Sequence, residues 1–453
     1  MARLFGTDGV RGIANSELTC ELTFKIGQAG AYVLTNEVHA PRIIIGRDTR
    51  ISGEMLSSAL VAGICSVGAE AVDAGIIPTP GLAYLVKQYN ADAAVMISAS
   101  HNSFEYNGLK WFNRHGYKLS DALEDAIEAI VTDSDAGLPL AEGSRIGCPV
   151  KAQNARLDYL ERLLDVSEND LSGVNIVLDC ANGAASGIAP ELFARLGATV
   201  HTLFNTPDGL NINAQCGSTH PHRLQQAVME KGADIGIAFD GDADRMIAVD
   251  EYGVVVNGDS IMAICAQDMK ERGVLKSNTI VATVMSNLGM KLCMRDVGID
   301  IAVTDVGDRY VLEKMRECDY SLGGEQSGHF IFLDKSTTGD GMLSALELLS
   351  VMKRKGESLT TLARQIEIFP QVLVNVRIKN EHKADCMKNK AMKTAIEKAE
   401  KKMGDAGRVL VRASGTEPLI RIMLEGRDQT SIQGEAIRIA HVLEEEFEGK
   451  IIQ

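Results

Sequence analysis

The chain has 453 residues, and its formal net charge is −15 at pH 7. A chain of this length is too long for a single hydrophobic core, so we expect three or four domains. The negative balance excludes nucleic acid and anionic membranes as general partners, because both require a cationic protein surface. Any phosphate ligand must therefore be held by a local group of arginines.

The nine cysteines include no C-x-x-C pair and show no regular spacing, which argues against a zinc site or a disulfide framework and favours a reducing compartment. The stretch from Met1 to Gly6 leads into glycine-rich sequence without an apolar signal core. The sequence has no run of about 20 apolar residues that could span a membrane. We therefore expect a soluble, cytoplasmic protein.

Strand-like and helix-like segments alternate along most of the chain, as is typical of α/β units around mixed or parallel sheets. Residues 42–45 form a β-branched run, a helical pattern starts at Ser52, and the apolar runs 93–97 and 235–239 predict buried strands. After about residue 370 the pattern changes. There we predict a smaller α+β domain with strands at 372–378 and 409–411 and helices at 384–402 and 431–447.

Three regions share an order of features that suggests an internal repeat. Each has a helix that ends in a glycine (Gly68, Gly197, Gly298), then a strand, and later an aspartate before an apolar strand (Asp92, Asp234, Asp319). Eight residues beyond those aspartates stand Ser100, Asp242 and Ser327. Identity between the copies is low, so chance alignment is a serious alternative. A true repeat would place three equivalent loops around a common centre.

The segment I-S-A-S-H-N at 97–102 places Ser100 next to His101 and Asn102, directly after a predicted buried strand. Loops that leave such strands hold the reactive groups of many α/β folds. Taken alone, Ser100 fits an ordinary polar turn better than a nucleophile. Three further loops, at 240–245, 324–329 and 412–421, change that balance, because together they suit a metal ion, a polyol and a phosphate.

The loop D-G-D-A-D-R at 240–245 carries carboxylates at alternate positions, Asp240, Asp242 and Asp244. In an extended loop this spacing can direct all three towards one hard cation. An EF-hand would need glycine where this chain has Arg245, and helices where strands are predicted. Mg²⁺ with room for a phosphate oxygen fits better. A solvated acidic turn is the simpler alternative, but it would leave the carboxylates to repel one another.

The segment R-A-S-G-T-E-P-L-I-R at 412–421 has the composition of an anion-binding loop. Arg412 and Arg421 offer bidentate donors, Ser414 and Thr416 add hydroxyls, and Gly415 allows backbone N–H groups to approach an anion. A Ser-Gly-Thr turn between strands is more often only a turn. Two flanking arginines in so acidic a chain favour phosphate binding.

In G-E-Q-S-G-H at 324–329, Glu325 and Ser327 suit hydrogen bonds to sugar hydroxyls, and His329 can exchange a proton near neutral pH. Isolated histidines are usually structural, so this interpretation depends on the neighbours of His329. Arg11 lies among glycines, and Lys110 follows the loop that contains Ser100, which we call the serine loop. Either could be a solvated surface cation, or could neutralise a transferring phosphoryl group near Ser100.

These four motifs, in this order and over essentially the whole chain, resemble those of the α-D-phosphohexomutases, and they are closest to the glucosamine branch. The resemblance implies that Ser100 is carried as phosphoserine and contributes to one Mg²⁺ site per chain with Asp240, Asp242 and Asp244. It assigns sugar binding to Glu325 and Ser327. It places Arg11, Lys110, Arg245 and His329 around the reacting phosphate, and Arg412, Ser414, Gly415, Thr416 and Arg421 around the other phosphate.

The fold that the resemblance implies is α/β, with three related mixed α/β domains and a smaller C-terminal α+β domain around a central cleft. The predicted domains are 1–152 with the phosphoserine, 153–255 with the metal, 256–369 with the sugar site and 370–453 with the phosphate loop. In the serine loop the family usually has proline where this chain has Ser103, and Asp-Asn before the glycine where this chain has Glu105-Tyr106-Asn107 before Gly108. Loss of the proline removes one restriction on the loop's conformation.

The implied reaction interconverts glucosamine 6-phosphate and glucosamine 1-phosphate and feeds UDP-N-acetylglucosamine synthesis. Phosphorylated Ser100 donates to the sugar, the resulting 1,6-bisphosphate turns end for end, and its other phosphate returns to Ser100. The same bisphosphate would serve as activator, and a homodimer is compatible with this scheme.

Three alternatives stay open at this point. Within the family, the chain could be a phosphomannomutase or phosphoglucomutase. A serine hydrolase would lack the G-x-S-x-G elbow and would leave the acidic loop without a role. A non-catalytic sugar-phosphate sensor would not need both Ser100 and three carboxylates.

Overall fold

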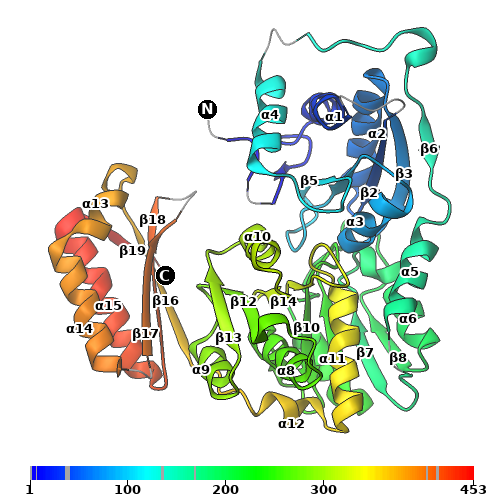
Figure 1. The fold of residues 1–453 in the computed structure, drawn as a ribbon. Helices are drawn as coiled ribbons and strands as arrows, with labels where there is room; N and C mark the ends of the chain where they lie inside the picture. The colour runs from blue at the N-terminus through cyan, green and yellow to red at the C-terminus, as the bar shows by residue number, and fades with distance from the viewer. Residues whose placement is uncertain are drawn as a thin grey trace. The chain divides into compact units, whose positions relative to one another are not determined.

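The computed structural model describes residues 3–6, 8–35, 41–133, 137–167, 170–404, 407–414 and 418–452. By the density of contacts the chain divides into two units (Figure 1). The first comprises Met1–Met285 and Val297–Gln365, and the second comprises Ser286–Asp296 and Ile366–Gln453.

The N-terminal part of the first unit is built on a six-stranded sheet with strand order β1-β5-β4-β2-β3-β6. Its strands are β1 Val10–Ile13, β2 Arg42–Arg47, β3 Glu70–Ile76, β4 Ala93–Ile97, β5 Tyr106–Asn113 and β6 Pro149–Lys151. Its helices are α1 Cys20–Thr35, α2 Ser52–Ser66, α3 Thr79–Gln88 and α4 Asp121–Thr132. Apolar side chains of α1, α2 and α4 form one core with the sheet, and α3 packs on β2 and β4.

The next sheet has five strands in the order β11-β10-β9-β7-β8. They are β7 Asn175–Asp179, β8 Thr199–Leu203, β9 Ile235–Phe239, β10 Met246–Asp250 and β11 Val255–Val256. The associated helices are α5 Ala155–Val166, α6 Ala189–Arg195 and α7 His222–Lys231. Every residue of β9 and β10 is buried, which explains why their sequences read as continuous apolar runs rather than as alternating patterns.

A third sheet, of four strands in the order β13-β12-β14-β15, completes the first unit. Its strands are β12 Thr279–Thr283, β13 Asp300–Thr304, β14 Leu322–Gly324 and β15 Phe330–Phe332. The helices around it are α8 Gly258–Glu271, α10 Asp308–Cys318, α11 Gly341–Lys355 and α12 Leu359–Ala363.

The three sheets repeat one topology, which confirms the internal repeat predicted from the sequence. In each sheet the second strand pairs in parallel with one side of the first, and the third strand pairs in parallel with its other side. The fourth strand then pairs antiparallel with the third. These four strands are β2, β3, β4 and β5 in one sheet, β7, β8, β9 and β10 in the next, and β12, β13, β14 and β15 in the last. The turn into the antiparallel strand carries the motif each time. Gly68, Gly197 and Gly298 each have positive φ, as expected just beyond a helix end.

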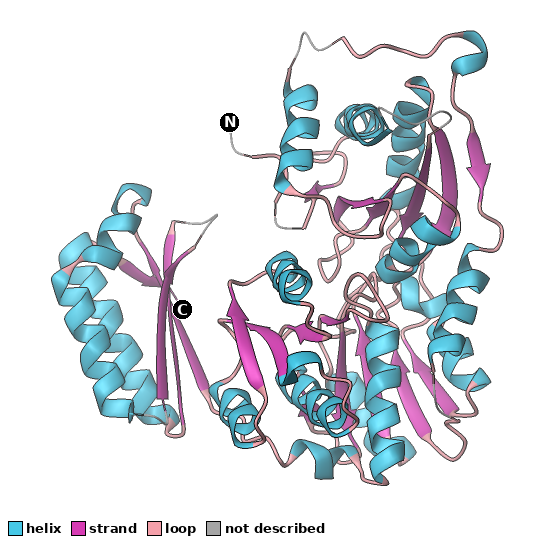
Figure 2. Cartoon of the chain, viewed as in Figure 1, coloured by secondary structure: helices cyan, strands magenta, loops and turns pink. Residues whose placement is uncertain are grey.

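The second unit contains α9 Leu288–Asp296 and a four-stranded antiparallel sheet with strand order β17-β18-β16-β19. The strands are β16 Gln371–Arg377, β17 Gly407–Ala413, β18 Leu419–Gly426 and β19 Lys450–Ile452. Figure 2 shows α14 Lys390–Met403 and α15 Gln429–Phe447 side by side along one face of this sheet, where their apolar residues share a core with β16 and β18. This is the α+β domain that the sequence predicts.

One predicted element differs from the structure. The helix expected at 384–402 is divided into α13 Lys383–Lys388 and α14. Asn389 lies between them with extended backbone, and its side chain accepts a hydrogen bond from the backbone N–H of Met392. Asparagine competes well for such N-cap positions, so it starts a new helix where the apolar spacing alone suggested continuity.

Among the described residues, no helix combines the length and the apolar composition that crossing a bilayer requires.

Candidate active site

Ser100 lies in the loop between β4 and β5, and its side chain is fully buried. Its φ of 52° is left-handed, a conformation that costs a non-glycine residue on the order of 1–3 kcal/mol and persists only where the surroundings impose it. In this conformation Ser100 Oγ donates a hydrogen bond of 2.6 Å to Asp240 Oδ2 and lies 3.3 Å from His101 Nδ1. The loop therefore holds one hydroxyl against the acidic loop of the second sheet.

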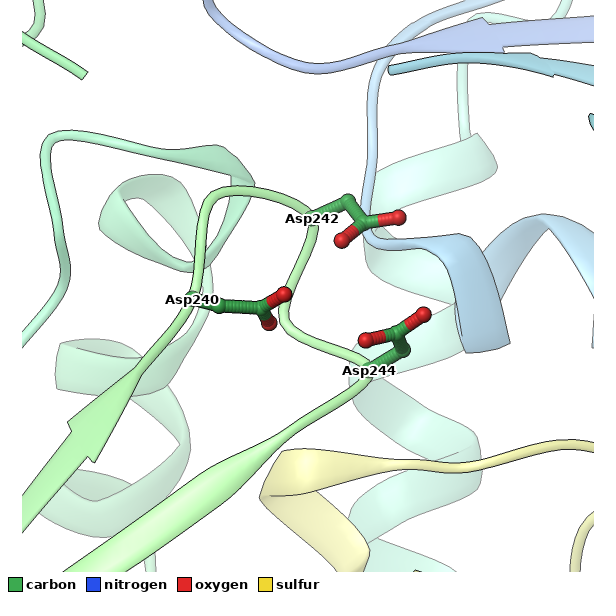
Figure 3. Close-up of side chains that lie close together, drawn as sticks. All are labelled: Asp240, Asp242 and Asp244. Atoms are coloured by element: carbon green, nitrogen blue, oxygen red, sulfur yellow. The ribbon is translucent and has the colours of Figure 1, made fainter. Parts of the chain in front are cut away.

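The acidic loop between β9 and β10 brings Asp240, Asp242 and Asp244 together. One oxygen of each carboxylate lies within 4.8 Å of the others, and Figure 3 shows the three side chains turned towards a shared space at the bend of the loop. Gly241 permits this arrangement, because a Cβ there would lie 2.5 Å from the carbonyl oxygen of Ser100.

The chemistry of this cluster fits a divalent cation. Within the described part of the chain, Asp242 Oδ1 and Asp244 Oδ1 are buried and accept no hydrogen bond. Burial, together with the charges of Asp244 and Asp242, raises the pKa of Asp240 well above its usual value. Carboxylates buried side by side repel one another, and a hard cation with oxygen ligands would offset their repulsion. The three aspartates could therefore hold a metal ion.

Lys110, on β5, is a buried cation beside this cluster. Its Nζ lies 2.8 Å from Asp242 Oδ2, 3.3 Å from Asp244 Oδ2 and 3.1 Å from Asp8 Oδ2. Burial opposes the charge on Lys110, but Asp242, Asp8 and Asp244 outweigh it and raise the pKa of Lys110 well above its usual value. The ammonium group is thus permanently charged near neutral pH.

Arg11 lies on β1, opposite Gly108 of β5, so Arg11 and Lys110 lie on neighbouring strands of the same sheet. Arg11 forms an ion pair with Asp8, whose other oxygen accepts a hydrogen bond from Lys118; Lys118 also contacts Asp308 at the start of α10. Arg11 Nε is buried without a hydrogen-bond partner among the described residues. A buried, unused donor of this kind is suited to an anionic ligand.

His329 and Arg245 connect the acidic loop to the third sheet. Their backbones form an isolated β-bridge, and His329 is 2% exposed. Both ring nitrogens of His329 and the Nε of Arg245 are buried without a hydrogen-bond partner in the part of the chain that the structure describes. Gly339 allows the imidazole to fit, because a Cβ at that position would lie 2.3 Å from His329 Nε2.

The turn between β14 and β15 contains Glu325 and Ser327. Glu325 Oε1 accepts a hydrogen bond of 3.1 Å from the backbone N–H of Gly307, whereas the Ser327 side chain is exposed. The carbonyl of Gly328 accepts a hydrogen bond of 3.0 Å from the backbone N–H of Met246, the first residue after the acidic loop's Arg245. The structure thus links all three motif-bearing turns of the first unit.

The predicted phosphate loop lies in the second unit, between β17 and β18. Arg412 and Arg421 are direct cross-strand partners, so their side chains leave the same face of the sheet. Ser414 is 5% exposed, and its carbonyl accepts a hydrogen bond of 2.8 Å from Lys383 Nζ. Gly415 and Thr416 lie outside the described residues.

The sequence did not predict several residues that contact the site residues or their ion-pair partners. The sequence predicts no role for His101 beyond its position next to Ser100, yet its Nδ1 also lies 3.4 Å from Arg245 Nη1. Burial and the charges of Arg245 and Arg11 lower the pKa of His101 to about 4, so its ring is neutral at pH 7. Its adjacency to Ser100 was the available signal. Asp8 lay in the glycine-rich segment around Arg11, whereas Lys118 and Asp308 lie in no motif.

Four family models cover the chain. They are the phosphoglucomutase/phosphomannomutase alpha/beta/alpha domain I at residues 2–137, domain II at 157–253, domain III at 257–369 and the C-terminal domain at 373–442. Among solved structures, a phosphoglucomutase/phosphomannomutase family protein from Burkholderia thailandensis is 23% identical, with a TM-score of 0.81 over 98% of this chain and 97% of that one. This likeness shows the shared fold.

Curated relatives are much closer in sequence. The phosphoglucosamine mutase of Thermoanaerobacter sp. strain X514 is 55% identical over 98% of this chain and 99% of its own length. That of Clostridium botulinum strain 657 is 51% identical over 100% of both chains. An N-acetylphosphoglucosamine mutase from Aspergillus fumigatus, solved with GlcNAc-6P and magnesium, is 15% identical with a TM-score of 0.69 over 98% of this chain and 95% of that one. The family models and the full-length identity together place this chain in the phosphoglucosamine mutase family of phosphohexomutases.

Proposed function

We propose that the chain interconverts glucosamine 6-phosphate and glucosamine 1-phosphate with Ser100 as the carrier of the phosphoryl group. The observation that supports this role most directly is the position of Ser100 Oγ, 2.6 Å from Asp240 Oδ2. A hydroxyl held next to three carboxylates that suit a metal ion is where a phosphate on serine would need charge compensation.

Phosphoryl transfer from Ser100 to the sugar breaks the bond between phosphorus and Ser100 Oγ and forms one to a sugar oxygen. The sugar hydroxyl loses a proton, and Ser100 Oγ gains one. Lys110, Arg11 and Arg245 supply fixed positive charge around the group in transit, and His329, whose ring nitrogens have no hydrogen-bond partner among the described residues, can exchange the proton. Return of the other phosphate of the bisphosphate reverses these bond changes and leaves the isomeric product.

Asp240, Asp242 and Asp244, with an oxygen of phosphorylated Ser100, would hold one Mg²⁺ per chain. When bound, Mg²⁺ supplies positive charge that stabilises the transferring phosphoryl group. The related Aspergillus fumigatus enzyme was solved with magnesium and, in another structure, with glucose 1,6-bisphosphate. These ligands support Mg²⁺ as the cofactor and a sugar 1,6-bisphosphate as the activator that phosphorylates Ser100.

The remaining predicted residues would position the substrate. Glu325 and Ser327 would bind sugar hydroxyls, and the phosphate that is not reacting would be bound by Arg412, Ser414, Gly415, Thr416 and Arg421. We further propose the four domains 1–152, 153–255, 256–369 and 370–453, a cytoplasmic location, and a phosphosugar rather than nucleic acid as the partner. A second copy of the chain is the one protein partner we propose.

The carrier role is tested by treating the purified protein with a hexosamine 1,6-bisphosphate and mapping the phosphorylated peptide by mass spectrometry. We expect one phosphoryl group on Ser100. Ser100→Ala should lose both the modification and turnover, whereas Ser103→Ala, in the same loop with an exposed side chain, should keep both. Near-normal turnover by Ser100→Ala would refute the proposal.

A further inference from the structure

The segment G-R-D-T-R at 46–50, which begins within the last two residues of β2, ends in a buried arginine. The side chains of Arg50 and Asp48 are both 0% exposed, and Arg50 Nε lies 2.9 Å from Asp48 Oδ2. Burying an arginine costs free energy unless its N–H groups form hydrogen bonds, because the charged guanidinium loses its hydration. The acceptors of the remaining Arg50 hydrogen bonds therefore indicate the role of this residue.

Four carbonyl oxygens, three in the serine loop and one at the first residue of β5, accept hydrogen bonds from the Arg50 guanidinium. Nη2 donates to the carbonyls of Ser100 and Asn102, both at 2.9 Å. Nη1 donates to the carbonyls of Tyr106, at 3.1 Å, and Ser103. A planar group with five donors can serve several acceptors in a fixed geometry, which an ammonium group cannot do.

Asp48 extends this contact to the start of the loop. Its Oδ2 accepts a hydrogen bond of 2.6 Å from Ser98 Oγ, and Ser98 Oγ accepts one of 2.9 Å from the backbone N–H of Ser100. Both the N–H and the carbonyl of Ser100 are therefore tied, directly or through Ser98, to the Arg50–Asp48 pair.

The serine loop has reason to need such support. Ser100 has a left-handed φ of 52°, and the family's usual proline is replaced by Ser103, so the local sequence does little to fix the backbone. Asn213 Nδ2 donates to the carbonyls of Ser100 and Asn102 at 2.8 and 2.9 Å. Arg50 and Asn213 thus share two acceptors, and of these two side chains it is Arg50 that also donates to the carbonyls of Ser103 and Tyr106.

We propose that Arg50 is a positioning residue for phosphoryl transfer: it holds the Ser100 loop in the strained conformation that directs Ser100 Oγ at the acidic loop. The proposal rests on the proposed carrier role of Ser100. Arg50 bonds to backbone carbonyls and not to Ser100 Oγ, so it acts on the reaction only through the geometry of the loop. Small displacements of a reacting atom are enough to cost about a hundredfold in rate.

The test uses the full-length enzyme, with Arg50→Lys and Arg50→Ala as variants and Arg47→Ala as the control. Arg47 lies in the same segment but pairs with Glu54 and Asp73 outside the serine loop. We expect kcat to fall by roughly ten- to a hundredfold in both Arg50 variants, with KM for glucosamine 6-phosphate within about twofold of the wild-type value. Arg47→Ala should keep wild-type kcat.

Two further measurements separate positioning from folding. Hydrogen exchange of the backbone amides of residues 100–106 should be faster in Arg50→Lys than in the wild type, while exchange in the other described segments is unchanged. Added guanidinium ion should partly restore kcat of Arg50→Ala, because it can occupy the vacated site and donate to the same carbonyls.

Wild-type kcat and wild-type exchange in Arg50→Lys would overturn the proposal. A lower kcat accompanied by a general loss of protection in both variants, without rescue by guanidinium, would assign Arg50 to overall stability and overturn it as well. Turnover by Ser100→Ala is a different result: it would refute the carrier role of Ser100 itself.

Discussion

The hydroxyl of Ser100 donates a hydrogen bond of 2.6 Å to Asp240, although 140 positions separate the two residues in the sequence. Ser100 follows β4 and Asp240 follows β9, the equivalent strands of two repeats. The repeat thus brings the proposed phosphoryl carrier and the proposed metal ligands together. A substitution in the acidic loop should therefore affect phosphoryl transfer at Ser100.

Asp242→Asn removes one charge from the metal-binding cluster while keeping the shape of the side chain. We expect turnover and the apparent affinity for Mg²⁺ each to fall by at least about tenfold, with a smaller change in KM for the substrate. Initial rates over a Mg²⁺ titration would measure both effects. Asp300→Asn, at an exposed position, is the control. A rise in KM alone would identify the loop as a substrate contact.

Lys110→Met leaves Asp242, Asp244 and Asp8 without their shared cation. Removing one partner of a buried ion pair typically costs about 3–5 kcal/mol, so Tm should fall markedly in the absence of Mg²⁺. Because bound Mg²⁺ would replace part of the lost charge, the fall should be smaller when Mg²⁺ is added. Thermal unfolding with and without Mg²⁺ tests this. An equal loss of Tm under both conditions would contradict a metal ion at the carboxylates beside Lys110.

Glu124→Gln should change how stability depends on pH. Burial raises the pKa of Glu124 to about 7, against the opposing charges of Arg309 and Arg3. Because the folded-state pKa lies above the unfolded one, the contribution of Glu124 to stability is complete below about pH 4.5 and is lost as pH rises through 7. Glutamine stays neutral, so this loss is absent from the variant. The free energy of unfolding of the variant, relative to that of the wild type, should therefore rise by roughly 2–3 kcal/mol from pH 5 to pH 8.

Denaturant unfolding of both proteins at pH 5 and pH 8 measures this difference. Glu128→Gln, on the same helix α4, controls for the removal of one negative charge. If Glu124→Gln and Glu128→Gln shift with pH in the same way, burial of Glu124 is not the cause.

Arg421→Ala tests the loop between β17 and β18. In both orientations of the bisphosphate the same loop would bind the phosphate that is not reacting, so the forward and reverse reactions should be impaired alike. Loss of one charge-assisted hydrogen bond is worth about 1.5–3 kcal/mol, or roughly ten- to a hundredfold in kcat/KM. Steady-state rates from glucosamine 6-phosphate and from glucosamine 1-phosphate provide the measurement. Unchanged kinetics in both directions would remove this loop from the mechanism.

The sequence predicted those parts of the site that are encoded locally. Ser100, the three aspartates and Glu325 each follow an apolar strand, and short-range patterns identify both the strand and the polar turn after it. The equivalent positions of Ser100 and Asp242 in the repeat then suggested that the turns meet. Sheet topology confirms this for the first unit.

The parts that escaped prediction depend on contacts between distant residues. Lys118 bonds to Asp8 and Asp308, which lie 110 and 190 positions away, so no local pattern marks it. Arg50 belongs to a loop that resembles an ordinary helix start, and its role emerges only from the carbonyls of residues 100–106. Asn389 shows the converse, because a local side-chain hydrogen bond interrupted a helix that the apolar spacing predicted as continuous.

The last prediction concerns the sugar. Glucosamine 6-phosphate should be used with a higher kcat/KM than glucose or mannose 6-phosphate, as expected for a chain 51–55% identical to phosphoglucosamine mutases over nearly its full length. Glu325 suits hydroxyls that the three sugars share, so discrimination must come from groups that lose a partner when the amine is replaced. One unmatched hydrogen bond of about 1–1.5 kcal/mol corresponds to roughly tenfold.

The comparison requires saturating Mg²⁺ and the bisphosphate that matches each sugar, because an enzyme left without phosphate on its serine would be mistaken for one that rejects the substrate. Under those conditions a preference of at least about tenfold for glucosamine 6-phosphate is expected. A higher kcat/KM for glucose or mannose 6-phosphate would contradict the glucosamine assignment, while the phosphoserine relay through Ser100 would stand, since its chemistry does not depend on the substituent at the sugar's second carbon.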